Sequence, residues 1–173
     1  MPSGYTTSLP TDVILETGLL YVNSVIIGVS RGGLRFNPGI TLGNIEYDGK
    51  KAPVKGLDRV VNRTPQIVGT FLQAGAANFR QYEPGGATPN ITPKPQGALF
   101  ASGDYLVNLD LVYARGGGGT ATVRFASALC VQYEVQGGSD AVGEAEISCT
   151  FEARLVHGAT PDDTAVPYTI TVA

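Results

Sequence analysis

Three glutamates with a regular spacing are the first candidates for chemistry in this chain. Glu144, Glu146 and Glu152 have the same parity within residues 143–156, so an extended strand would display all three on one face. Juxtaposed carboxylates of this kind carry out acid–base catalysis in glycoside hydrolases. The favoured interpretation is a solvated strand face, or a face that lines a channel or contacts another subunit. A channel face with these charges would repel polyanions.

No other residues form a catalytic or metal-binding pattern. His157 is the single histidine, which excludes a histidine pair for zinc, and no Gly-x-Ser-x-Gly elbow accompanies it. The glycines 116–119 are not followed by the Gly-Lys-Ser/Thr of a phosphate-binding loop. Asp162 and Asp163 lack the remaining ligands of a calcium loop. We therefore expect no enzyme activity, no catalytic residue, no cofactor and no metal.

The two cysteines, Cys130 and Cys149, lie on separate predicted strands. Cys149 has the parity of its apolar neighbours Ile147 and Phe151, whereas Cys130 has the parity opposite to its own apolar neighbours. This pattern predicts that the two side chains do not face each other. We expect two reduced, partly buried thiols and no disulfide.

Charge gathers in a polar stretch over residues 48–63, which we interpret as a long protruding loop. Its charged residues are Asp48, Lys50, Lys51, Lys55, Asp58, Arg59 and Arg63. Binding of nucleic acid is disfavoured, because no aromatic residue interleaves with these charges and the whole chain has a net charge of -3. Two interpretations stay open: solvated loop charge, and pairing with an acidic face of another copy.

The elements that must position these residues are mainly strands, because apolar and polar residues alternate over 105–115, 120–136 and 143–156. The glycines 116–119 and residues 136–140 supply turns, so these three strands are expected to form an antiparallel meander. The predicted inward sets are Tyr105, Val107, Leu109, Leu111 and Tyr113; Val123, Phe125, Leu129, Val131, Tyr133 and Val135; and Ala145, Ile147, Cys149, Phe151, Ala153 and Leu155.

Further strands are predicted over residues 18–29, 34–36, 40–47, 66–73 and 168–172, with turns at 31–33 and 37–39. Residues 74–82 form a short helix in this interpretation, ending before Pro84, and a second short helix fits 97–102. The predicted fold is mainly β: two packed antiparallel sheets, sandwich- or barrel-like, flanked by one short α-helix and carrying a long protruding loop. We expect one domain over residues 1–173.

Composition points toward self-association. Hydrophobic residues make up 43% of the 173 residues and charged residues only 16%, which leaves a soluble monomer short of polar covering. The sequence pI of about 5.1 argues against a basic surface that binds the phosphate groups of nucleic acid. The apolar stretch 18–29 is too short for a membrane span and lacks the basic flank of a signal peptide. We therefore expect production in the cytoplasm and no membrane association.

One ordered set of segments resembles a known family. Arg31-Gly32-Gly33 to Pro38 is followed by Ile45-Glu46-Tyr47-Asp48-Gly49-Lys50-Lys51-Ala52-Pro53-Val54-Lys55-Gly56. This order is similar to the N-terminal pattern of the major tail proteins of siphophages, which form the tail tube. That pattern is a glycine-rich turn and strand leading to a Glu-x-Asp-Gly-Lys element and a Pro-x-Lys-Gly loop. Residues 145–155 and 167–170 are similar too, so the resemblance covers most of the chain.

The resemblance implies a structural subunit of a bacteriophage tail tube. In that family subunits form hexameric rings, the sheets of one ring join into an inner β-barrel, and the rings stack into a conduit for genome ejection. The implied partners are other copies of the chain, a tape measure protein and tail tip or terminator proteins, in a virion assembled in the host cytoplasm. DNA would pass through the lumen without specific binding. Residues 48–59 would make the contact between rings.

Two alternatives remain. One is another phage structural module, such as a capsid decoration or tail-terminator protein. The other is a β-sandwich domain that binds carbohydrate or protein, although the chain has no Trp to serve as a binding platform.

Overall fold

The described part of the chain is mainly antiparallel β-structure, as predicted, and it contains almost no helix. The structure is a computed structural model and describes residues 18–28, 30–44, 58–72, 81–83, 92–116, 118–137, 146–155 and 166–173. The strands are β1 (Leu19–Val22), β2 (Val25–Ile26), β3 (Ser30–Asn37), β4 (Ile40–Asn44), β5 (Asp58–Arg63), β6 (Gln66–Phe71), β7 (Leu106–Ala114), β8 (Thr120–Gln136), β9 (Glu146–Ala153) and β10 (Thr169–Val172).

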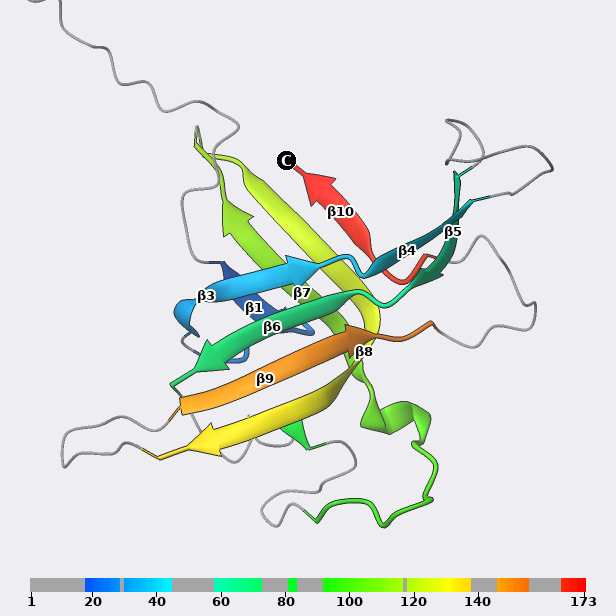
Figure 1. Ribbon diagram of the computed structural model, residues 1–173. Helices are drawn as coiled ribbons and strands as arrows, with labels where there is room; N and C mark the ends of the chain where they lie inside the picture. Colours follow the sequence, from blue (N-terminus) through cyan, green and yellow to red (C-terminus); the bar gives the residue numbers. More distant parts are fainter. Residues whose placement is uncertain are drawn as a thin grey trace, which may run out of the picture.

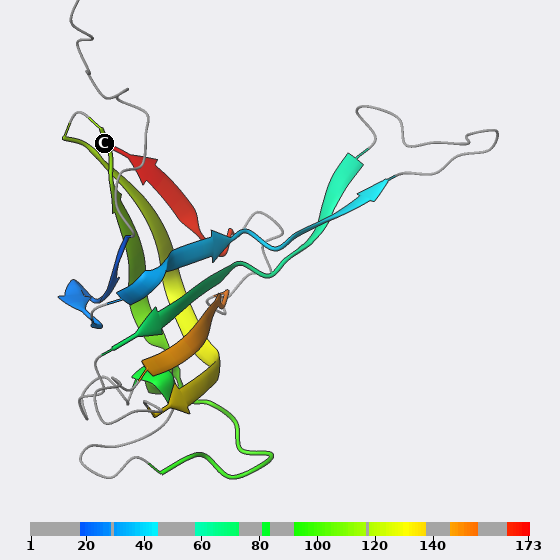
Figure 2. The same cartoon turned by 60° about the vertical axis from the view of Figure 1, so that its left-hand side comes forward.

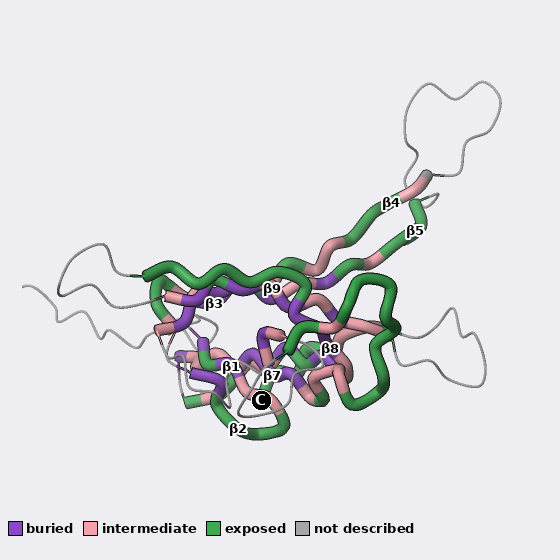
Figure 3. The backbone as a smooth tube through the Cα atoms, turned by 90° about the horizontal axis from the view of Figure 1, so that it is seen from below, coloured by how far each residue is buried: buried purple, intermediate pink, exposed green. Residues whose placement is uncertain are grey.

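Eight of these strands form one sheet that folds over into two layers (Figures 1 and 3). The strand order is β2-β1-β7-β8-β9-β6-β3, with β10 also paired to β8. β8 belongs to both layers: its first half pairs with β7 and β10, and from Ala128 onward it pairs with β9. The second layer is therefore β8-β9-β6-β3. The predicted meander of β7, β8 and β9 and the predicted packing of two layers are both confirmed.

The inward face of β8 changes parity where the strand passes between the layers. Phe125 and Ala128 are both fully buried although they are three residues apart, a spacing that a regular strand would place on opposite faces. On the facing strand β7, Leu106 and Leu109 both pack into the core, and Asn108 between them has a φ of 52°. A left-handed residue at this point bends the strand pair around the corner of the sandwich.

A second irregularity follows at Val131, where the register between β8 and β9 shifts. Cys130 lies opposite Phe151 and points into the core with it, while Val131 is the extra residue of a bulge. The prediction that Cys130 and Cys149 do not share a face is therefore wrong. The prediction of two free thiols is confirmed, since both cysteines are buried and unpaired.

The predicted inward set of β8 is only partly correct. Val123, Phe125 and Leu129 are buried, but Val131, Tyr133 and Val135 are exposed. Val107 on β7, also predicted to face inward, is exposed as well. The second half of β8 thus carries apolar side chains that the subunit itself does not cover.

Two predicted turns have different roles in the structure. Residues 31–33 do not end a strand, because β3 runs through them with a register shift and positive φ at Gly32 and Gly33. The stretch predicted as one strand over 18–29 is the hairpin of β1 and β2, turning at Asn23 and Ser24 with φ of 48° and 67°. The glycine turn between β7 and β8 is confirmed, with Arg115 N donating to Gly119 O at 2.9 Å.

Helix is nearly absent from the described residues. Gln81 and Tyr82 have helical backbone, and the rest of the helix predicted at 74–82 lies outside the described ranges. Tyr82 is fully buried against Phe71 and Phe151, with ring centroids 6.2 Å from each. The helix predicted at 97–102 is wrong; the chain there forms only a single 3-10 turn, η1 (Ser102–Asp104).

An arm formed by β4 and β5 projects from the sandwich (Figure 2). β3 continues into β4 through Pro38 and Gly39, β5 continues into β6, and Thr64 N donates to Gly39 O at 3.0 Å at the junction. The region predicted as a loop over 48–63 therefore ends in a strand that carries Asp58, Arg59 and Arg63. Asp48, Lys50, Lys51 and Lys55 lie outside the described residues.

The fit of Leu34 over Gly69 gives a test of the packing within the second layer. A methyl group at Gly69 would clash with the Leu34 side chain, so Gly69→Ala should destabilise the fold by about 1–3 kcal/mol. The same change in a Leu34→Ala background should cost much less, because the clashing atoms are gone. Urea unfolding followed by circular dichroism measures both, at protein concentrations low enough to keep the chain monomeric. Equal costs in the two backgrounds would contradict this packing.

Candidate assembly interface

The described residues contain no cluster of three His, Cys, Asp or Glu side chains able to hold a metal ion. His157 and the Asp162–Asp163 pair lie outside the described residues. Within the same described ranges, no helix has the length and apolar character needed to cross a membrane. The features that stand out are open strand edges, an apolar arm and a pocket.

The first feature is an open edge along the second half of β8. The pairing of β7 with β8 ends at Ala128, and beyond it β9 lies on the opposite side of β8. Over residues 129–136, no described strand pairs with the side that β7 has left. An exposed edge of this length offers its N–H and C=O groups to another chain.

The second feature is the free edge of β3, at the other end of the same layer. β3 pairs only with β6 in the described sheet. Because β3–β6, β6–β9 and β9–β8 are all antiparallel, β3 runs opposite to β8. The two ends of the layer are therefore directed so that β3 of one copy could pair antiparallel with β8 of the next.

The outward face of this layer is mostly polar, and several of its charged side chains form ion pairs. Arg31 on β3 donates to Glu146 on β9 at 2.6 Å. Between them lie small hydroxyl side chains, with Thr70 and Ser148 hydrogen-bonded at 3.2 Å. Exposed pairs of this kind add little stability, but they cancel charge locally.

Glu152 is compensated in the same way. It accepts hydrogen bonds from Gln66, at 3.1 Å, and from Arg154. Burial raises the pKa of Glu152, but the hydrogen bonds outweigh burial and hold the pKa below its usual value. Glu144 lies outside the described residues. Glu146 and Glu152 are thus ion-paired groups, and the expected repulsive acidic face is not formed by these two.

The arm carries an apolar stripe on one of its faces. Leu42 and Val60 are directly opposite each other, and Ile40 lies two residues from Leu42 on the same strand. All three are exposed, and Leu42 is 64% exposed. Val61 is the extra residue at a register shift, and its side chain lies across Gly43 on the other face. Such a ribbon buries little apolar surface on its own.

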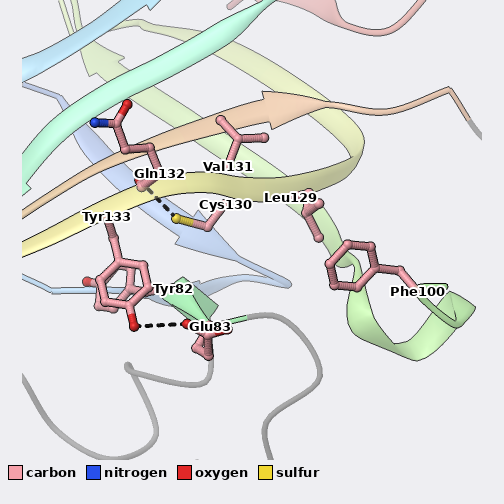
Figure 4. A pocket seen from close by; sticks show the side chains of 8 residues that line it. All are labelled: Tyr82, Glu83, Phe100, Leu129, Cys130, Val131, Gln132 and Tyr133. Carbon is pink, nitrogen blue, oxygen red and sulfur yellow. Dashed lines mark hydrogen bonds between the residues drawn. The ribbon is translucent and has the colours of Figure 1, made fainter. Parts of the chain in front are cut away.

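A pocket of about 500 Å³ opens beside the free half of β8 (Figure 4). Its lining residues are Tyr82, Glu83, Phe100, Leu129, Cys130, Val131, Gln132 and Tyr133. On one side Tyr133 donates to Glu83 at 2.9 Å, and this hydrogen bond raises the pKa of the Tyr133 phenol. On the other side Leu129 lies toward Phe100. The pocket is therefore mostly apolar, with one carboxylate.

The other layer holds a further ion pair that the sequence did not single out. Arg124 on β8 makes two hydrogen bonds to Asp110 on β7, at 2.7 and 2.6 Å, and this carboxylate raises the pKa of Arg124. The two residues are directly opposite in the ladder and form a structural cross-strand pair.

Sequence reasoning found the charged residues of this region but missed the apolar ones. Among the seven loop candidates, only Asp58, Arg59 and Arg63 lie on a described element. Ile40 and Leu42 are two residues apart, and this spacing was the signal in the sequence that could have predicted an apolar stripe on one face of a strand. The pocket gave no signal, because residues 81–83, 92–100 and 129–133 are distant in sequence.

The chain matches no protein-family model, and a search of curated proteins gives no match either.

The buried thiols predict a loss of stability at alkaline pH. Burial raises the pKa of Cys130 to about 11 and also raises the pKa of Cys149. In the unfolded chain thiols ionise near a pKa of about 8.5, so the folded state binds more protons above that pH. The free energy of unfolding should therefore fall as pH rises from about 8.5 toward 11.

The matched variant is Cys130→Ala combined with Cys149→Ala, with urea unfolding measured between pH 8 and about 9.5, below the range of tyrosine ionisation. The variant is expected to have a lower overall stability but a nearly flat pH dependence in this window. A slope equal to that of the parent chain would show that the thiols are not the titrating groups.

Proposed function

We propose that this chain is a structural subunit of a bacteriophage tail tube that assembles into stacked hexameric rings forming a conduit for genome ejection. The observation that carries the proposal is the second layer, β8-β9-β6-β3, which ends in two free and oppositely directed edges. The hexameric number and the phage assignment come from the sequence resemblance. In this proposal the chain has no catalytic role.

Joining β3 of one copy to β8 of the next satisfies both edges with a single type of contact. The contact is heterologous, since different surfaces meet, and such contacts close into a ring when the rotation between copies permits. A closed ring leaves neither edge of this layer open, which removes the liability of a long exposed β8. The exposed apolar side chains of Val131 and Val135 on that edge support this use.

The outward face of the same layer would line the conduit. Most of its side chains are hydroxyls, amides and ion pairs such as Arg31–Glu146, and Arg35 and Glu134 add one charge of each sign. Paired charges and small polar groups hold DNA weakly, because binding of the phosphate backbone depends on unpaired basic side chains. DNA would therefore pass without specific binding. A tape measure protein would occupy the conduit before ejection, and tail tip or terminator proteins would contact the tube ends.

The edge of β8 provides the first test of this function. Val131→Lys combined with Val135→Lys places two charges on the free edge and should abolish ring formation, because unpaired charges oppose edge pairing. The matched control is Val107→Lys, an equally exposed apolar position on β7. Negative-stain electron microscopy and sedimentation velocity measure assembly, and circular dichroism verifies the fold. Rings formed by the edge variant as readily as by the control would contradict the proposal.

The basic residues between β4 and β5 provide a separate test of stacking. Reversing Lys50 and Lys51 to Glu is expected to leave single rings intact while preventing their growth into tubes, since contacts between rings need complementary charges. Electron microscopy distinguishes rings from tubes directly. Tubes of normal length from this variant would reject a stacking role for residues 48–59.

A further inference from the structure

The arm needs a partner surface outside its own subunit. Its apolar stripe of Ile40, Leu42 and Val60 is exposed, and the arm projects away from the sandwich in both views (Figures 1 and 2). The pocket beside Phe100 lies along residues 129–133 of β8, at the opposite edge of the second layer from β3, and in both views the arm projects away from segment 92–104. Stripe and pocket can therefore meet only between copies.

The register of the second layer shows where a neighbouring arm would come to lie. Asn37, at the end of β3, is level with Gln66, Glu152 and Leu129 across the four strands. Both β3 and the free half of β8 are eight residues long, and they run in opposite directions. Pairing them between copies sets Asn37 of one copy nearest to Leu129 of the next.

The arm leaves β3 directly after Asn37, through Pro38 and Gly39. A neighbouring copy's Ile40 and Leu42 would therefore continue past Leu129 toward Phe100. Leu129 and Phe100 face each other at one side of the pocket; Phe100 is 40% exposed, whereas Leu129 is buried. We call these two side chains the Phe100–Leu129 platform.

The platform is held in place before any partner arrives. Lys94 forms an ion pair with Asp104 at 2.5 Å and lies over the Phe100 ring, 5.8 Å from its centroid. Asp104 also accepts a hydrogen bond from Ala101 N at 2.6 Å. These contacts pin the segment on both sides of Phe100, which lowers the entropy cost of docking.

We infer that the apolar stripe of the arm docks on the Phe100–Leu129 platform of the adjacent copy in the same ring. This inference rests on the proposed function, because the relative placement follows from pairing of β3 with β8. The partner is a second copy of this chain, and the contact is head to tail. Each ring interface then has two parts. Backbone hydrogen bonds join β3 to β8, and apolar contacts join the beginning of the arm to the Phe100–Leu129 platform.

Cysteine cross-linking between two singly substituted proteins tests this contact. Leu42→Cys and Phe100→Cys proteins are mixed in equal amounts, assembled and oxidised with diamide, and the products are separated on a non-reducing gel. Both substituted positions are exposed, whereas Cys130 and Cys149 are buried. A covalent dimer containing one copy of each protein is expected. The matched control replaces Leu42→Cys with Val61→Cys, on the opposite face of the same arm, and should give no such dimer.

The outcomes separate this inference from the function on which it rests. Rings seen by electron microscopy without the Leu42–Phe100 dimer would overturn the docking while leaving the tube proposal standing. An equal yield from Val61→Cys would also overturn it, since the contact would then not depend on the stripe. Protein that stays monomeric under all conditions would overturn both.

Discussion

The structure depends on a change of pairing along β8, because at Ala128 the pairing with β7 ends and the pairing with β9 begins. Up to that residue β8 pairs with β7 on one side, and over Ala121–Arg124 it also pairs with β10 on the other. Beyond it β9 pairs on one side, and the described chain supplies no strand for the other. Because one 17-residue strand serves both layers, the sandwich bends at this point and leaves an edge open. The open edge is thus a consequence of the topology.

Alternation in the sequence was sufficient to predict the meander of β7, β8 and β9, because each strand is long enough for a period of two to be unambiguous. It was insufficient to predict which face of β8 points inward. A parity argument assumes a regular strand, and the corner between Phe125 and Ala128 and the bulge at Val131 each break that regularity. Ala128 and Cys130 therefore point inward against the predicted parity. Tyr133 and Val135 lie opposite the buried Cys149 and Ile147, so they keep the predicted inward face, but they are exposed at the free edge of the layer.

In the arm, a strand was mistaken for part of a loop. Its charged residues predicted a loop, yet Asp58, Arg59 and Arg63 lie on β5, because pairing with β4 matters more than the low strand propensity of individual charged residues. Neither the apolar stripe nor the pocket could be predicted from local patterns. The stripe depends on the register shift at Val61, and the pocket brings together segments that are separated by tens of residues.

Several charged side chains are compensated within one subunit. Arg31–Glu146, Arg154–Glu152 and Arg124–Asp110 are the pairs, and Asp110 is buried. An exposed pair such as Arg31–Glu146 contributes only about 0–1 kcal/mol, so it does not drive folding or association. Association within a ring would instead come from backbone pairing and apolar contact. The neutralised face is suited to a conduit that does not retain its cargo.

The central claim is that β3 of one copy pairs with the free half of β8 of the next. Hydrogen–deuterium exchange of assembled and monomeric protein tests it most directly, because amides that gain a strand partner exchange more slowly. Assembly is expected to protect the amides of residues 30–37 and 129–136 together, while β7, which is already paired on both sides, changes little. Unchanged exchange at both edges in fully assembled particles would contradict it.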